Sequence, residues 1–243
     1  MQVEFLGTSG FHPTERRHTS CVFLPEAGIV FDAGTGIFRL PKRLKTTHLN
    51  IVLSHSHLDH VVGLTYLLPH IAEGTLESAS VIASPQTIQN IREHLFSPAL
   101  FPVRVPYEFI EMTEPRQIGD ARLSYRDQEH PGGSRGYRLD WPDRSLAYVT
   151  DTRVDLPGLE FLRRVDLAIH ECTYRDEYQE LADLSGHCTT TAVCSMARDA
   201  GVKRLILTHF DPYLDLEDPV DLEKAHSIFP GAEAAYDGFT VDF

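Results

Sequence analysis

The chain has 243 residues, of which 42% are hydrophobic and 23% charged, and this balance is ordinary for a globular protein large enough for a sizeable core. No apolar stretch approaches the roughly 18 residues of a membrane span, and the N-terminus shows no basic region or cleavage site, so we expect neither membrane insertion nor secretion. The net charge of −13, from 22 basic and 35 acidic residues, argues against a large polyanionic partner, because long nucleic acids are bound through Lys and Arg.

The four cysteines, Cys21, Cys172, Cys188 and Cys194, are scattered along the chain and form no CxxC pair. This pattern favours free thiols in a reducing compartment over a disulfide framework or a thiolate zinc site. We therefore expect a cytoplasmic protein.

Short apolar strands alternate with helical segments in the first half of the chain. Hydrophobic runs bounded by turn residues predict strands over 2–6, 21–24, 28–34, 47–54 and 78–84. Apolar residues at helical spacing predict helices over 59–71 and 84–95, and the second of these opens with a serine cap followed by proline.

The second half repeats the alternation. Strands are predicted over 107–112, 122–130, 135–141, 145–151, 165–173, 203–210 and 238–243, and helices over 189–201 and near 219–227. Two strand-rich halves with helices outside predict an α/β fold, a four-layer αββα sandwich of two mixed sheets. Because no Pro/Gly/Ser-rich linker divides the chain, we expect a single domain over residues 1–243.

Five predicted strands end in a histidine, a carboxylate or both, in the segments IVLSHSHLDH, SYRDQEHPGG, LAYVTDT, DLAIHECT and LILTHF. Strand ends deliver side chains to a shared rim, which is where open sheets usually hold ligands. A single histidine at a strand end carries little information, but five such ends predict a common site.

The segment HSHLDH is the densest of these. His55 and His57 are two residues apart, so they point the same way in extended backbone. Asp59 and His60 begin the next predicted helix and turn back toward the same space. Two ligands in each direction suit two metal ions better than one.

His-x-His-x-Asp-His after a strand resembles the signature of the metallo-β-lactamase fold superfamily, and the remaining segments follow that superfamily's order over nearly the whole chain. More narrowly, the chain resembles the branch of tRNase Z and related phosphodiesterases. The opening GTSGFHPTERRHTSC is similar to that branch's GTS…PT…RN-S stretch, and HECTY, GHCTTTAV and LTHF are similar to its HEATF, GHST and LTHFS motifs.

The resemblance implies two Zn²⁺ ions per chain, held by nitrogen and oxygen donors that zinc accepts and that Mn²⁺ or iron would also accept. The implied ligands fall into three groups: His55, His57 and His130 for one ion; Asp59, His60 and His209 for the other; and Asp151 as the bridge. Two such ions about 3.5–4 Å apart activate a water and stabilise displacement at phosphorus.

The resemblance also implies catalytic roles for three residues. Asp59 would lie beside the metal-bridging hydroxide, while Glu171 and His187 would form a pair near the leaving group. A carboxylate that orients a histidine and raises its pKa provides a proton donor for a leaving alkoxide. Cys172 and Cys188 replace the family's Ala and Ser, and we interpret both as packing residues.

Two departures bear on the substrate. Only 20 residues separate His130 from Asp151, where common bacterial tRNase Z proteins carry a long arm. The family's THFS-x-RY becomes THFDPY, which removes an Arg and adds Asp211. With the net charge, these departures favour a phosphodiesterase for small, cyclic or nucleotide-like phosphodiesters over one for large RNA.

Two alternatives stay open: a tRNase Z-like endoribonuclease with a reduced arm, and a metal-binding sensor or scaffold with low turnover. The complete ligand set weakens the second of these. The resemblance also implies a homodimer as one option.

Overall fold

The computed structural model describes residues 1–214 and 216–243. They form two compact units: Met1–Glu114 with Asp237–Asp242, and Pro115–Tyr236 with Phe243. Each unit is built on one seven-stranded mixed sheet. Within the described residues, no helix has the length and apolar character that a membrane crossing requires.

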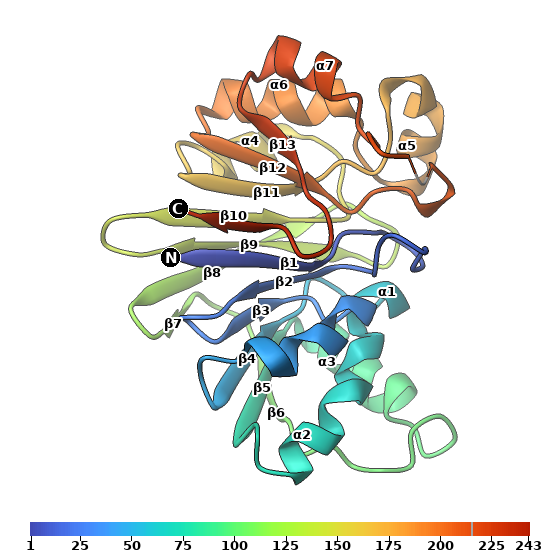
Figure 1. Ribbon diagram of the computed structural model, residues 1–243, viewed down its shortest axis with the longest axis vertical. Helices are drawn as coiled ribbons and strands as arrows, with labels where there is room; N and C mark the ends of the chain where they lie inside the picture. Colours follow the sequence, from blue (N-terminus) through green and yellow to red (C-terminus); the bar gives the residue numbers. More distant parts are fainter. Residues whose placement is uncertain (215) are drawn as a thin grey trace. The chain divides into compact units, whose positions relative to one another are not determined.

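The sheet of the first unit has the order β14-β1-β2-β3-β4-β5-β6 (Figure 1). Neighbours from β14 to β3 are antiparallel, and those from β3 to β6 are parallel. The strands are β1 (Gln2–Gly7), β2 (Cys21–Leu24), β3 (Ile29–Phe31), β4 (His48–Val52), β5 (Ser78–Ala83), β6 (Glu108–Glu111) and β14 (Thr240–Asp242). The strands predicted at the N-terminus are therefore confirmed.

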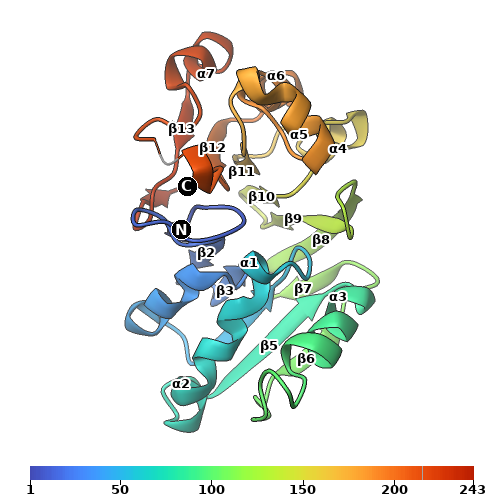
Figure 2. The ribbon, with the colours of Figure 1, turned by 90° about the vertical axis from the view of Figure 1, so that its right-hand side faces the viewer.

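Helical segments cover one face of this sheet (Figures 1 and 2). They are η1 (Thr35–Arg43), α1 (Leu58–Val61), η2 (Val62–Leu67), α2 (Leu68–Ala72), α3 (Pro85–Asn90) and η3 (Ile91–Leu95). Their buried side chains form one core with strand residues, such as Ile37 of η1 and Leu64 of η2 against Val30 and Ile51. Burial of such apolar side chains is the main force that holds helices on a sheet.

The helix predicted over 59–71 is confirmed in position, but its middle part is the 3-10 helix η2 between the α-helical segments α1 and α2. The Gly63 backbone N–H donates to Ala33 O at 2.8 Å, and a Cβ on Gly63 would lie 2.3 Å from Gly34 O. This close approach to the chain after β3 replaces a regular helical hydrogen bond. The predicted cap of the next helix is confirmed, since Ser84 Oγ accepts from the Thr87 N–H at 3.1 Å.

The sheet of the second unit has the order β13-β12-β11-β10-β9-β8-β7. Here β10 to β13 are parallel and β7 to β10 antiparallel. The strands are β7 (Arg116–Ile118), β8 (Ala121–Gln128), β9 (Ser134–Asp140), β10 (Ser145–Val149), β11 (Leu167–Glu171), β12 (Arg204–Thr208) and β13 (Ala232–Ala234). Only two strands and a turn therefore fill the short interval between His130 and Asp151.

The helical segments of this unit are α4 (Leu156–Phe161), η4 (Asp176–Tyr178), α5 (Gln179–Ser185), α6 (Thr190–Ala200), η5 (Pro212–Leu214) and α7 (Leu222–Ile228). Residues of α6 and α7, among them Val193, Ala197 and Ala225, share one buried core with Ala168 and Leu205 of the sheet. This core fixes β10, β11 and β12, the strands at whose ends Asp151, Glu171 and His209 lie.

Candidate metal centre

Three residues that directly follow parallel strands have a left-handed backbone conformation. Two of them, Asp151 and His209, are predicted site residues, and the third, Asp32, was not predicted. Asp32 follows β3 with φ 57°, Asp151 follows β10 with φ 50°, and His209 follows β12 with φ 59°. Side chains other than glycine seldom adopt this region, and such strain concentrates at functional sites. Both sheets thus use the carboxyl ends of their parallel strands to present polar side chains.

In the first unit, Asp32 organises the segment after β4. Ser54 donates to its carboxylate from the backbone N–H at 2.7 Å and from Oγ at 2.9 Å. His60 Nδ1 lies 2.8 Å from the same carboxylate, and both side chains are fully buried. This bond assigns the proton to Nδ1, so that Nε2 of His60 can act as a ligand.

His55, His57 and Asp59 lie beside His60. The His55 ring centroid is 4.4 Å from that of His57 and 4.3 Å from that of His60. Asp59 Oδ2 lies 3.1 Å from His60 Nε2 and accepts the Phe11 N–H at 2.8 Å. The structure therefore gathers the three histidines and the aspartate of HSHLDH into a compact group of imidazole and carboxylate donors.

In the second unit, Gly186 positions His130. His130 Nδ1 lies 3.2 Å from the Gly186 carbonyl, and His130 Nε2 lies 3.4 Å from Asp151 Oδ2. Gly186 ends α5 with φ 80°, and a Cβ there would lie 2.8 Å from Pro131 Cδ. Only glycine meets both requirements, so the glycine of the SGHCT segment orients a predicted ligand.

Asp151 lies between two histidines. Its Oδ2 faces His130, as described above, and its Oδ1 lies 3.2 Å from His209 Nε2. One possible ligand atom from each of Asp151, His187 and His209 lies within 4.8 Å of the others. A carboxylate that presents one oxygen to each side has the arrangement that a bridging ligand needs.

Glu171 is completely buried at the end of β11 and receives several hydrogen bonds. Its Oε1 accepts the Thr152 N–H at 2.8 Å and lies 2.9 Å from His187 Nδ1. Its Oε2 accepts the Thr173 hydroxyl at 2.7 Å. Burial acts to raise the pKa of Glu171, but the neighbouring His187 and His209 outweigh it and lower that pKa to about 2. Glu171 is therefore ionised at neutral pH.

Thr173 couples this carboxylate to His209. Because its single hydroxyl proton is donated to Glu171, Thr173 Oγ1 acts as the acceptor for His209 Nδ1 at 3.0 Å. That assigns the proton of His209 to Nδ1 and leaves Nε2 toward Asp151. Asp32 and Thr173 thus serve the same purpose in the two units, although one is a carboxylate and the other a hydroxyl.

The two cysteines of this region are packing residues, as the sequence suggested. Burial raises the pKa of both the Cys172 and the Cys188 thiol. Cys188 Sγ donates to Thr152 O at 2.8 Å, and Cys172 Sγ lies 3.5 Å from Thr190 Oγ1. Neither thiol has the properties of a nucleophile.

The nine predicted site residues thus form two groups, each gathered within its own unit. Sequence reasoning did not identify Asp32, Thr173 or Gly186 as residues that orient the histidines. The sequence did contain a signal for Asp32, because the strand in GIVFDAG is followed by this carboxylate and pairs with β4. Imidazole nitrogens with fixed tautomers and nearby carboxylate oxygens form a donor set that fits zinc, manganese or iron.

A protein-family model described as a beta-lactamase superfamily domain matches residues 28–210. A curated relative, Ribonuclease Z from Acaryochloris marina, is 29% identical over 98% of this chain and 96% of its own length. That alignment extends over 300 positions, whereas this chain has 243 residues, so the relative carries dozens of residues that this chain lacks.

Two solved structures have the same fold. The metallo-beta-lactamase fold protein YhfI from Bacillus subtilis superposes with a TM-score of 0.82 at 20% identity, covering 99% of this chain and 98% of its own. A diphosphatase from the PhnP family superposes with a TM-score of 0.75 at 20% identity, covering 100% of this chain and 96% of its own. The expected fold of two mixed sheets flanked by helices is confirmed.

Proposed function

The chain belongs to the beta-lactamase superfamily, and from that premise we propose that it is a dinuclear metal-dependent phosphodiesterase acting on small, including cyclic, nucleotide-like phosphodiesters. One observation carries the proposal. One possible ligand atom of His187 lies within 4.8 Å of those of Asp151 and His209, and the His187 ring is hydrogen-bonded to the buried, ionised Glu171. A phosphodiester needs such a group, because its leaving alkoxide must receive a proton.

The proposed ligands are those that the sequence predicted, with Zn²⁺ as the first choice of metal: His55, His57, Asp59, His60, His130, Asp151 and His209. Bound ions of this kind supply a water of lowered pKa and neutralise charge at phosphorus. The protein side chains supply orientation, since Asp32, Thr173 and the Gly186 carbonyl each hold one imidazole by its Nδ1.

His187 has two candidate roles that differ in what they predict. Its Nδ1 faces Glu171, so only Nε2 is available to the site, either as a metal ligand or as the proton donor. We propose the donor role, because Glu171 holds the ring by a charge-assisted hydrogen bond that favours the protonated imidazolium. Asp59 is proposed to orient the attacking water.

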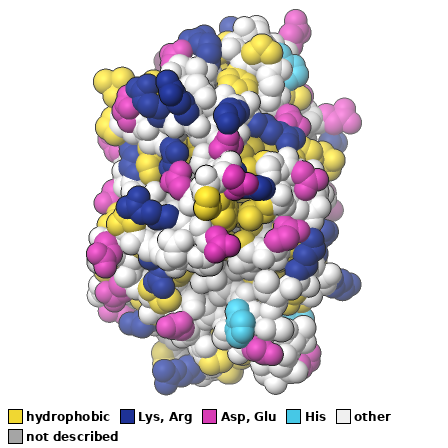
Figure 3. Space-filling view, turned by 90° about the vertical axis from the view of Figure 1, so that its left-hand side faces the viewer, with side chains coloured by type: hydrophobic (Ala, Val, Ile, Leu, Met, Phe, Trp, Pro, Cys, Tyr) yellow, Lys and Arg dark blue, Asp and Glu magenta, His cyan; other side chains and the backbone are white. Residues whose placement is uncertain are grey.

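Two features support a small substrate. The interval between β9 and β10 is a short turn, and the aligned Ribonuclease Z is longer than this chain. Figure 3 draws the side of the molecule away from α1, and basic and acidic side chains are interspersed on that face. With a net charge of −13, electrostatic support for a long RNA is weak.

An endoribonuclease of the tRNase Z kind is the second candidate. The observation that favours it is the similarity to Ribonuclease Z over nearly the whole of both chains. It would require RNA contacts that compensate for the shorter chain.

One hydrolysis panel with metal quantitation separates the candidates. The substrates are a nitrophenyl phosphodiester, 2′,3′- and 3′,5′-cyclic nucleotides, precursor tRNA, a lactam and a thioester. We expect two metal ions per chain and the highest kcat/KM on a small phosphodiester. Preference for precursor tRNA would establish the second candidate, and preference for the lactam or thioester would contradict both.

A further inference from the structure

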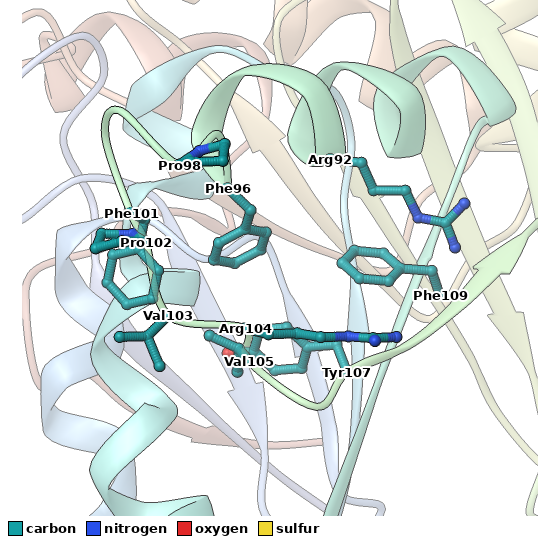
Figure 4. Close-up of a pocket in the computed structure, with 10 residues that line it drawn as sticks. All are labelled: Arg92, Phe96, Pro98, Phe101, Pro102, Val103, Arg104, Val105, Tyr107 and Phe109. Carbon is teal, nitrogen blue, oxygen red and sulfur yellow. The ribbon is translucent and has the colours of Figure 1, made fainter.

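A pocket of about 500 Å³ opens in the first unit along the segment that joins η3 to β6 (Figure 4). Four aromatic side chains line it. The Phe96 ring centroid lies 5.6 Å from that of Phe101, 6.1 Å from that of Tyr107 and 6.5 Å from that of Phe109. The Tyr107 hydroxyl donates to Leu64 O at 2.6 Å, so this ring is held in place while Phe96, Phe101 and Phe109 remain half-buried.

The charged side chains that line the pocket are both basic. Arg92 and Arg104 line it, and none of its lining residues is a carboxylate. The Arg92 guanidinium lies 4.8 Å from the Phe109 ring centroid, and both guanidinium groups lie at the Phe109 end of the pocket in Figure 4. Glu93 and Glu111 border a neighbouring hollow together with Arg92, but neither makes an ion pair with it.

We infer that this pocket binds a nucleoside monophosphate, with the base against the aromatic rings and the phosphate at Arg92 and Arg104. Aromatic faces bind any base by stacking, and guanidinium groups bind phosphate oxygens in bidentate geometry. An aliphatic anion would gain no stacking from these rings. In a protein of net charge −13, an acid-free pocket with two arginines is a local exception that fits an anion.

This site is separate from the proposed metal centre, because none of the predicted ligands lines the pocket. It therefore goes beyond the proposed function, and neither depends on the other. The ligand could be a free mononucleotide or one nucleotide of a single-stranded RNA. The net charge leads us to expect the free mononucleotide.

The test measures AMP binding by calorimetry on the metal-loaded full chain and maps 8-azido-AMP cross-links by peptide mass spectrometry. We expect cross-links within residues 92–109. Arg92→Glu and Arg104→Glu should each weaken AMP binding about tenfold, the effect of one lost charged hydrogen bond. Arg122→Glu, an exposed arginine of β8, is the matched control and should bind AMP as the wild type does.

Turnover of the nitrophenyl phosphodiester should be unchanged in all three variants. Adenosine, inorganic phosphate and octanoate are comparison ligands, each expected to bind more weakly than AMP. Penta-adenylate distinguishes the source, since binding much tighter than that of AMP would identify RNA. Unchanged AMP affinity in both pocket variants, cross-links only outside 92–109, no AMP binding, or octanoate binding as tight as AMP would each overturn the inference.

Discussion

The proposed ligands are oriented by neighbours that are not themselves proposed as ligands. Asp32, Thr173 and the Gly186 carbonyl each engage an imidazole Nδ1, which leaves Nε2 of His60, His209 and His130 as the available donor. Groups in this position fix the ring and strengthen its basicity.

Asp32 gives the most direct test of this orientation. Asp32→Asn keeps the size of the side chain, and Asn tolerates the positive φ of 57°. We expect metal affinity to fall about 10–100-fold, because the carboxylate that orients His60 is lost. Competition with a chelating dye measures this, and Asp166→Asn, which alters a half-buried carboxylate bonded to Ser145, is the control. Equal metal affinities of the two variants would show that Asp32 does not orient a metal ligand.

Gly186→Ala tests the left-handed residue that precedes His187. Alanine would have to adopt a φ of 80°, and its methyl group would contact Pro131 and His130 too closely. We expect a loss of about 1–2 kcal/mol in the free energy of unfolding, together with weaker metal binding. Gly74→Ala is the control, since its φ of 75° is similar but its Cβ meets no atom. A variant as stable as the control, with wild-type metal content, would contradict this role.

His187→Ala distinguishes the proton donor from a metal ligand. As a donor, His187 affects substrates with poor leaving groups, so their kcat should fall about 10²–10⁴-fold while nitrophenyl phosphodiester turnover changes little. Metal content, measured by plasma mass spectrometry, should stay at the wild-type value. Equal slowing of both substrates, or loss of an ion, would show that the donor role is wrong.

At the scale of elements, the chemistry follows from strand order. The sequence showed which strands end in ligands, because the apolar runs and the polar residues after them are local features. It did not show that β3 lies beside β4, and therefore missed Asp32. The change from α-helix to 3-10 helix after Val61 was missed for the same reason, since the contact of Gly63 with Ala33 joins residues that are distant in sequence. The ligands at the strand ends were predictable from sequence, whereas the groups that orient the histidine rings were not.

The cap of α3 tests an element that the sequence predicted correctly. Ser84→Ala removes the acceptor for the Thr87 N–H and should lower the free energy of unfolding by about 1 kcal/mol. Urea denaturation measures this loss. Ser97→Ala, which lies after η3 and caps no helix, should change the stability by much less. Equal effects of the two substitutions would mean that the cap contributes nothing.

At the scale of the whole molecule, the fold and the family are established, whereas the single domain over 1–243, the zinc and the substrate stay predictions. The seven proposed ligands come from both compact units. A metal ion that binds the folded chain but not the unfolded chain should stabilise it, by about 2.7 kcal/mol at a free metal concentration one hundred times its Kd. The same ligand set contains one residue, Asp151, whose two oxygens face different histidines.

Asp151→Ala therefore tests the central claim most directly, because a bridging carboxylate would serve both ions. Metal content per chain and phosphodiester turnover are measured on the same purified sample. The proposal predicts that both metal content and turnover fall together in the variant, while its circular dichroism spectrum remains that of a folded protein. Two metal ions per chain retained in Asp151→Ala would contradict the dinuclear assignment.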